Sequence, residues 1–91
     1  MVVISHDTFN QNDRWRSVIV VPVSTSETQK GRGPTAVTLP KDEGGLPEES
    51  VALCHQVTTL DRGKLDTYLG TLSPQSMAEL DAGIKAALNL A

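Results

Sequence analysis

Ser24, Thr25 and His55 are side chains of types that could hold or move a proton in a reaction. Ser24 and Thr25 end a run of Val and Ile residues, where a hydroxyl can donate a hydrogen bond to a phosphate or a sugar. A serine hydroxyl has no useful basicity at neutral pH unless a neighbouring base activates it, whereas histidine titrates near neutrality. The hydroxyls are also consistent with a simple strand end and the histidine with a core position, so both interpretations stay open.

The only tryptophan, Trp15, lies between Arg14 and Arg16. An aromatic face stacks on any base, and a guanidinium binds a phosphate through paired N–H donors. The alternative is a tryptophan that covers the end of a small core while its arginines reach solvent. Two further cations, Lys30 and Arg32, lie in a loop rich in Gly, where they either contact nucleic acid or are simply solvated.

The overall composition limits the classes of function. The 91 residues carry 8 Lys and Arg against 11 Asp and Glu, a net charge of -3, so any nucleic-acid contact must be local. The single cysteine, Cys54, excludes an internal disulfide, fits a reducing cytoplasm and is predicted only to pack in the core. No apolar run approaches a membrane span, and no metal-binding or cofactor-binding motif is present, so we expect one soluble cytoplasmic domain over residues 1–91 without a metal or cofactor.

A β-rich scaffold must position these side chains. The run 18–23 is predicted to form a central strand buried on both faces, with Pro22 marking a bulge or the approach to an edge. Further strands are expected at 2–4, 34–39, 50–57 and 67–72, and one helical turn at 7–10. Residues 58–65 are expected to form a short strand that runs into a single helical turn. In the strand 50–57 the side chain of His55 would share a face with apolar residues, because side chains alternate along a strand.

The C-terminal region has the pattern of an amphipathic helix. Ser73 is a natural N-cap, and Pro74 suits the first helical position. Apolar residues recur at helical spacing at Met77, Leu80, Ile84, Leu88 and Ala91. The pattern predicts about four helical turns that cover the sheet.

The order of these segments resembles the MazF/PemK family of bacterial toxin endoribonucleases over nearly the whole chain. The resemblance is carried by Phe9-Asn10, the strand that ends in hydroxyls, Gly45-Leu46-Pro47, 51–57 with Gln56, Thr59-Leu60-Asp61-Arg62, and the closing helix. It implies a mainly β fold with a C-terminal helix, a small SH3-like barrel that assembles as a symmetric homodimer.

The same resemblance implies a toxin of a type II toxin-antitoxin system. Such a toxin is a metal-independent endoribonuclease that cuts single-stranded RNA, often mRNA, at short specific sequences and inhibits translation and growth, and a cognate antitoxin blocks its RNA groove. The implied reaction is attack of a ribose 2′-hydroxyl on its own phosphate, which needs a proton acceptor, a proton donor and positive charge near the phosphate. The catalytic threonine of the family matches Ser24, and Thr25 lies beside it.

Two departures from the family pattern affect this expectation. The catalytic arginine of the family precedes the strand matched by 2–4, so the resemblance implies an N-terminally truncated form of the fold without that cation. The position of His55 is commonly acidic in the family. We therefore expect Ser24 and Thr25 to position the substrate, while His55 or one of the arginines supplies proton or charge.

The site residues expected on this basis form two groups. Catalytic roles are expected for Ser24, Thr25 and His55. RNA contacts are expected from Arg14, Trp15, Arg16, Lys30, Arg32 and Gln56. The alternative is a catalytically impaired homologue that acts as an antitoxin-binding or dimerisation module.

Overall fold

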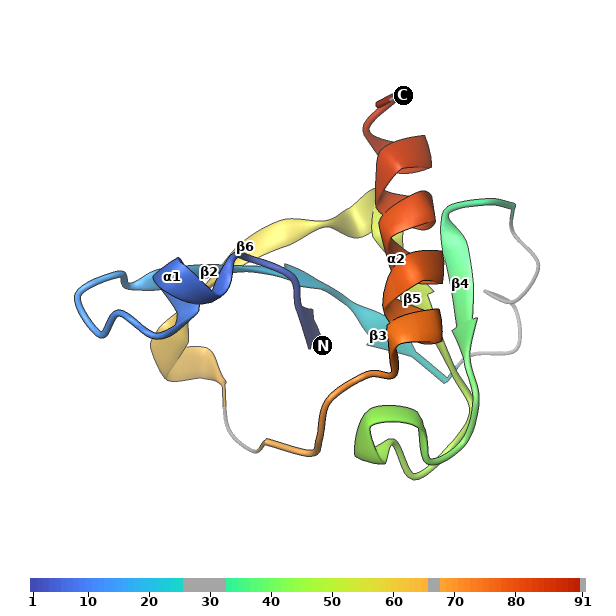
Figure 1. Cartoon of the computed structure of the whole chain (residues 1–91), viewed down its shortest axis with the longest axis horizontal. Helices are drawn as coiled ribbons and strands as arrows, with labels where there is room; N and C mark the ends of the chain where they lie inside the picture. The colour runs from blue at the N-terminus through green and yellow to red at the C-terminus, as the bar shows by residue number, and fades with distance from the viewer. Residues whose placement is uncertain (26–32, 66–67, 91) are drawn as a thin grey trace.

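The computed structural model describes residues 1–25, 33–65 and 68–90, which form two three-stranded antiparallel sheets and a C-terminal helix (Figure 1). The first sheet has the order β1-β2-β6 and the second the order β3-β5-β4. The strands are β1 Val2–Val3, β2 Ser17–Val21, β3 Val23–Ser24, β4 Ala36–Leu39, β5 Ser50–Leu53 and β6 Thr58–Asp61. The helices are α1 Asp7–Asn10 and α2 Pro74–Ala87, and the 3₁₀ turns are η2 Glu43–Gly45, η3 Cys54–Gln56 and η4 Arg62–Lys64.

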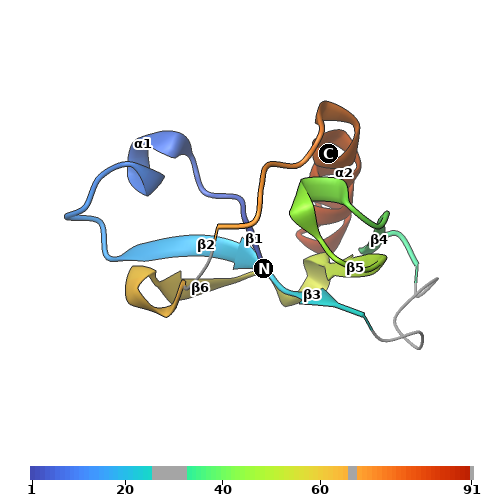
Figure 2. The same cartoon turned by 90° about the horizontal axis from the view of Figure 1, so that it is seen from below.

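The two sheets are connected at Pro22, where the chain leaves β2 and enters β3 (Figure 2). Proline has no N–H to donate to a strand partner, but its carbonyl accepts a hydrogen bond from the Leu53 N–H at 2.9 Å. Val23 then pairs with Ala52 in the second sheet. The expected interruption at Pro22 is therefore a passage from one sheet to the other.

The central strand β2 is buried mainly on one face. Val18, Val20 and Val21 are buried, as predicted, but the side chain of Ile19 is 42% exposed. Ile19 pairs with Thr59 of β6, which is also exposed. The prediction of a strand buried on both faces is wrong at Ile19 because no described element covers that position.

The main core lies between α2 and the second sheet, where Leu80 of the helix is fully buried (Figure 1). Its buried members are Val21, Val37, Leu39, Ala52, Cys54 and Leu80. The close approach of the helix requires Gly83, because a Cβ there would lie 2.8 Å from both the Cys54 sulfur and a Val37 methyl. Burial raises the pKa of the Cys54 thiol, in agreement with its predicted packing role.

Helix α2 begins where the sequence predicts. The Ser73 hydroxyl accepts a hydrogen bond from the Ser76 N–H at 3.2 Å, and Pro74 occupies the first helical position. At the other end Asn89 adopts a left-handed φ of 57°, and the Leu90 N–H donates to the Lys85 carbonyl at 2.8 Å. This is a Schellman ending, in which asparagine takes the place usually held by glycine. The helix therefore stops at Ala87, before the end of the predicted apolar stripe.

Two predicted strand segments differ from the structure. Strand β5 ends at Leu53, and η3 follows because the Val57 N–H bonds back to the Cys54 carbonyl at 3.2 Å. His55 is therefore exposed on a 3₁₀ turn, and the prediction that it lies on a strand among apolar neighbours is wrong. Residues 68–72 form no strand, since their path is set by packing against η2. The strand pairings among the described residues give two sheets, and the closed SH3-like barrel stays a prediction.

Two chain segments cross closely at three glycines, Gly44, Gly45 and Gly70, which we call the glycine crossing. Gly45 has a φ of +80°, and a Cβ there would lie 2.3 Å from the Leu69 carbonyl oxygen. A Cβ on Gly70 would lie 2.9 Å from the carbonyl group of Gly44. Side chains at these positions would separate η2 from the segment that leads into α2.

Candidate functional site

Ser24 and Thr25 lie at the end of β3, an edge strand of the second sheet. Ser24 is half-buried and pairs with Val51, while Thr25 is exposed and directly precedes residues that the structure does not describe. A hydroxyl at such an edge can donate a hydrogen bond to a phosphate oxygen and accept one from a sugar hydroxyl. The geometry suits a positioning role for these two side chains.

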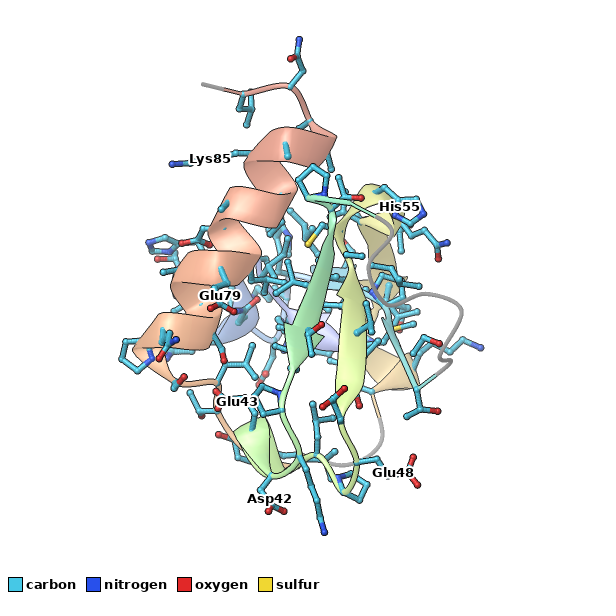
Figure 3. All side chains as sticks on the ribbon, turned by 90° about the vertical axis from the view of Figure 1, so that its right-hand side faces the viewer. Asp42, Glu43, Glu48, His55, Glu79 and Lys85 are labelled. Atoms are coloured by element: carbon cyan, nitrogen blue, oxygen red, sulfur yellow. The ribbon has the colours of Figure 1, made fainter. Side chains whose placement is uncertain are left out.

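His55 and Gln56 are neighbours on η3, and both side chains are exposed. The Gln56 Nε2 lies 3.4 Å from the His55 Nε2, and either histidine tautomer fits this contact. The side chain of His55 points outward at the end of the molecule opposite Asp42 and Glu48 (Figure 3). The structure thus brings together two of the predicted site residues.

The strand register separates His55 from Ser24. Ser24 pairs with Val51 near the start of β5, whereas Pro22 is bonded to Leu53 at its end. His55 follows Leu53 in η3, so it lies beyond the end of β5 that is remote from Ser24. Within one chain the imidazole and the hydroxyl are therefore not positioned to act on the same proton.

The connection between β1 and β2, residues 5–16, forms an exposed loop that we call the arm. Its two aromatic rings, Phe9 and Trp15, stack with centroids 4.6 Å apart and planes inclined by 32°. They are 40% and 48% exposed and are not part of the main core. The ring pair therefore presents apolar surface to solvent, which suits base stacking better than covering the core.

The two arginines beside Trp15 have different surroundings. Arg16 forms an ion pair with Asp61 at 3.3 Å, but both side chains are exposed, so the pair contributes little to stability. Arg14 is exposed, and within the described residues its guanidinium forms no ion pair. Both cations remain accessible to a phosphate.

Strand β2 separates the arm from the hydroxyl pair Ser24 and Thr25 (Figure 2). At about 3.3 Å per residue, the five residues of β2 span about 16 Å. Arg14 and Arg16 lie before this strand, and Ser24 follows Pro22 beyond it. The structure therefore does not bring these arginines to the hydroxyls within one chain. Lys30 and Arg32, the other predicted cations, lie outside the described residues.

The sequence interpretation missed Arg62, the first residue of η4. Its guanidinium donates four hydrogen bonds to main-chain carbonyls of the arm, at Phe9, Asn10, Asn12 and Trp15. The neighbouring Asp61 carboxylate accepts a hydrogen bond from the Gly63 N–H at 2.8 Å and binds Arg16. The segment 61–63, at the end of β6 and the start of η4, therefore fixes the arm. In the sequence, only the match of this segment to the family pattern indicates that it is important.

A largely apolar groove of about 580 Å³ lies between β1, η2 and the segment that precedes α2. Val3, Leu46, Leu69 and Met77 are among the residues that line it, and no predicted site residue is among them. None of the described helices has the length and apolar character of a membrane span, and no cluster of three potential metal ligands occurs among the described residues.

Comparison with known proteins gives consistent results. The family model of the PemK-like, MazF-like toxin of type II toxin-antitoxin systems matches residues 1–88. The protein "Endoribonuclease MazF" of Staphylococcus saprophyticus subsp. saprophyticus is 32% identical over 90 residues, which cover 99% of this chain and 72% of that protein.

Solved structures show the same fold. The Mycobacterium tuberculosis toxin MazF-mt6 superposes with a TM-score of 0.83 at 21% identity, covering 99% of this chain and 85% of that one. An endoribonuclease in complex with its cognate antitoxin from a mycobacterial species superposes with a TM-score of 0.80 at 22% identity, covering 98% of this chain and 79% of that one. With the family match over residues 1–88, these likenesses show that the chain belongs to the PemK-like, MazF-like toxin family of type II toxin-antitoxin systems.

Proposed function

We propose that this chain is a sequence-specific endoribonuclease that cleaves single-stranded RNA without a metal ion. The observation that carries the proposal is the match to the toxin family over residues 1–88, together with 32% identity to a protein named Endoribonuclease MazF. Cleavage of mRNA by such an enzyme would inhibit translation and growth. A cognate antitoxin and a second copy of this chain are the proposed protein partners.

The proposed reaction is an internal transfer of the phosphate. The ribose 2′-hydroxyl attacks its own phosphorus, the bond from phosphorus to the 5′-oxygen breaks, and a 2′,3′-cyclic phosphate and a 5′-hydroxyl result. One group must accept the proton of the 2′-hydroxyl, and another must donate a proton to the leaving oxygen. We assign positioning of the 2′-hydroxyl or the phosphate to Ser24 and Thr25, because hydroxyls at a strand edge can form these hydrogen bonds without acting as bases.

Proton transfer and RNA binding are assigned to other groups. We assign acid–base chemistry to His55, whose exposed imidazole lies on η3. Because the register separates His55 from Ser24, these two residues would serve one phosphate only from different copies of the chain or after rearrangement. Proposed RNA contacts are made by Arg14, Trp15, Arg16, Lys30, Arg32 and Gln56.

The proposal is tested by incubating the protein with a long single-stranded RNA in EDTA. We expect Ser24→Ala to lower the cleavage rate by about 10²-fold, the effect typical of losing one hydrogen-bond donor to the reacting phosphate. Thr59→Val is the matched control, because it also removes one strand hydroxyl, at an exposed position in β6. Absence of cleavage by the unchanged protein, or equal rates for the protein and Ser24→Ala, would contradict the proposal.

One observation favours a second function, an antitoxin-binding or dimerisation module with impaired catalysis. The arginines Arg14 and Arg16 are separated from Ser24 by the length of β2, so neither supplies charge there within one chain. This function predicts that the protein binds its antitoxin and forms dimers but leaves the RNA intact in the same assay.

A further inference from the structure

The main chain of the arm is folded around a single guanidinium, that of Arg62. Arg62 Nη1 donates to the Asn10 carbonyl at 2.7 Å, and Nε donates to the Trp15 carbonyl at 3.1 Å. Nη2 donates to the carbonyls of Phe9 and Asn12 at 2.9 and 3.2 Å. Arginine carries five N–H donors in a rigid planar fork, and these contacts use donors on all three nitrogens.

The four carbonyls are the polar partners of this cation within the described residues. No carboxylate lies within ion-pair distance of Arg62 in the part of the chain that the structure describes. Hydrogen bonds from a charged donor are stronger than those between neutral groups, so one side chain can bring four peptide groups together. The Arg62 N–H adds a fifth bond, to the Arg16 carbonyl at 2.7 Å.

Packing contributes little to the shape of the arm. Helix α1, which forms part of it, contains no buried residue, and the rings of Phe9 and Trp15 are about half exposed. The other described contacts that fix the arm are polar: the Asn10 amide bonds to Ser5, and Arg16 pairs with Asp61. The conformation of the arm therefore depends on hydrogen bonds, and four of them are donated by the Arg62 guanidinium.

The same guanidinium holds the carbonyls of both residues whose rings stack. Phe9 and Trp15 are six positions apart in sequence, and Arg62 binds both of their main-chain oxygens. We propose that Arg62 is a positioning residue that holds the ring pair and Arg14 in the arrangement that binds single-stranded RNA. This inference rests on the proposed RNA function, and it assigns to Arg62 no contact with the RNA.

Two substitutions of Arg62, with a control at Lys64, separate positioning from charge. Arg62→Gln removes the guanidinium. The matched control is Lys64→Gln, because Lys64 is an exposed residue of the same turn, two positions after Arg62, and its substitution also removes one positive charge. Arg62→Lys keeps the charge but cannot form the planar fork. The probe is a 2′-O-methyl RNA oligonucleotide, which binds but cannot be cleaved through a 2′-hydroxyl. The fluorescence of Trp15, the only tryptophan, reports the arm directly.

We expect Arg62→Gln and Arg62→Lys to increase quenching of Trp15 by acrylamide and to weaken RNA binding about tenfold, the scale of losing one stacked base. Lys64→Gln should leave the quenching unchanged. In a Trp15→Ala background, Arg62→Lys should weaken RNA binding by a smaller factor, because one of the two rings that it positions is already gone. All comparisons are made at a temperature where circular dichroism shows each variant folded.

The outcomes distinguish this inference from the proposed function. If the unchanged protein binds no RNA, the proposed function fails, and the quenching data still decide whether Arg62 orders the arm. If the unchanged protein binds RNA and Arg62→Lys binds equally well, the inference is overturned. It is also overturned if Arg62→Lys weakens binding by the same factor with and without Trp15, since Arg62 would then act on the RNA independently of the ring pair.

Discussion

Two connections of this chain, the arm and the glycine crossing, are fixed in place by different physical means. The arm is joined to the first sheet by hydrogen bonds that the Arg62 guanidinium donates and by the ion pair of Arg16 with Asp61, and α1 within it buries no residue. The glycine crossing places main chain against main chain, at separations that leave no room for a Cβ at Gly45 or Gly70.

The difference indicates which connection can move without unfolding the domain. Polar contacts at the surface can open locally, because water replaces each broken hydrogen bond at little net cost. At the glycine crossing the two main chains are in direct contact, so opening would lose this packing, and η2 is also bonded through Glu43 to Ser73 at the start of α2. We therefore expect changes in the arm to alter binding and changes in the glycine crossing to alter stability.

Gly45→Ala should give the largest loss of stability. The substitution places a Cβ 2.3 Å from the Leu69 carbonyl oxygen at a φ of +80°, so strain and displacement add. We expect a decrease of about 3 kcal/mol in the free energy of unfolding, measured by urea denaturation. Gly33→Ala is the control: its φ is +110°, but its Cβ would meet no described atom within 4 Å, so it should cost only about 1 kcal/mol. Equal losses for the two variants would mean that the crossing is not the cause.

Asn10→Ala should have a smaller effect on stability, confined to the arm. The Asn10 amide donates to the Ser5 carbonyl at 2.7 Å and accepts from the Ser5 hydroxyl, which also accepts from the Ile19 N–H at 3.2 Å. Loss of these part-buried bonds should cost about 1 kcal/mol and increase the exposure of Trp15 to acrylamide. Gln11→Ala, which removes an exposed amide from the same arm, should change neither quantity. Unchanged quenching in Asn10→Ala would show that the conformation of the arm does not depend on the hydrogen bonds between Asn10 and Ser5.

Glu43→Gln should have the smallest effect, visible as a change in the response to acid. The Ser73 N–H donates to the Glu43 carboxylate and lowers the pKa of this group below its ordinary value of 4.5 (Figure 3). Because the folded pKa is the lower one, the carboxylate stabilises the fold above about pH 4.5 and loses this contribution as the pH falls through the folded pKa. Urea midpoints measured from pH 7 to pH 3 should therefore converge for the protein and Glu43→Gln at low pH.

Glu79→Gln is the control for this measurement. It removes one negative charge from the exposed face of α2, away from η2 (Figure 3). The gap between the midpoints of this variant and those of the protein should change less with pH than the gap for Glu43→Gln. A constant gap between the protein and Glu43→Gln at every pH would contradict the assigned role of Glu43.

Local sequence patterns predict the elements whose signals are local. The hydroxyl of Ser73 and the ring of Pro74 define the start of α2, and the structure confirms both. The single turn at α1 and the passage from β6 into η4 are also confirmed. At the start of α2 the residues that fix the backbone lie within one turn of the helix itself.

The missed features depend on contacts between distant positions. Alternation along a strand predicts a face for His55 only if the strand continues, and β5 stops at Leu53. Pro22 indicates an interruption of the strand but not a change of sheet, which depends on pairing with β5. Arg62 contacts carbonyls about 50 positions away. Every residue carries a main-chain oxygen, so the sequence does not indicate which oxygens accept these hydrogen bonds. The site residues predicted from the sequence stay predictions that the RNA assays must decide.

The bonds from Arg62 have a consequence for how the arm could diversify. They end on peptide oxygens, which every amino acid carries, so replacing the rings of Phe9 and Trp15 need not remove a single bond to the guanidinium. One charged anchor could then support many different exposed side chains without redesign of the scaffold. The arm resembles in this respect an antibody loop, whose framework stays constant while its contact residues vary.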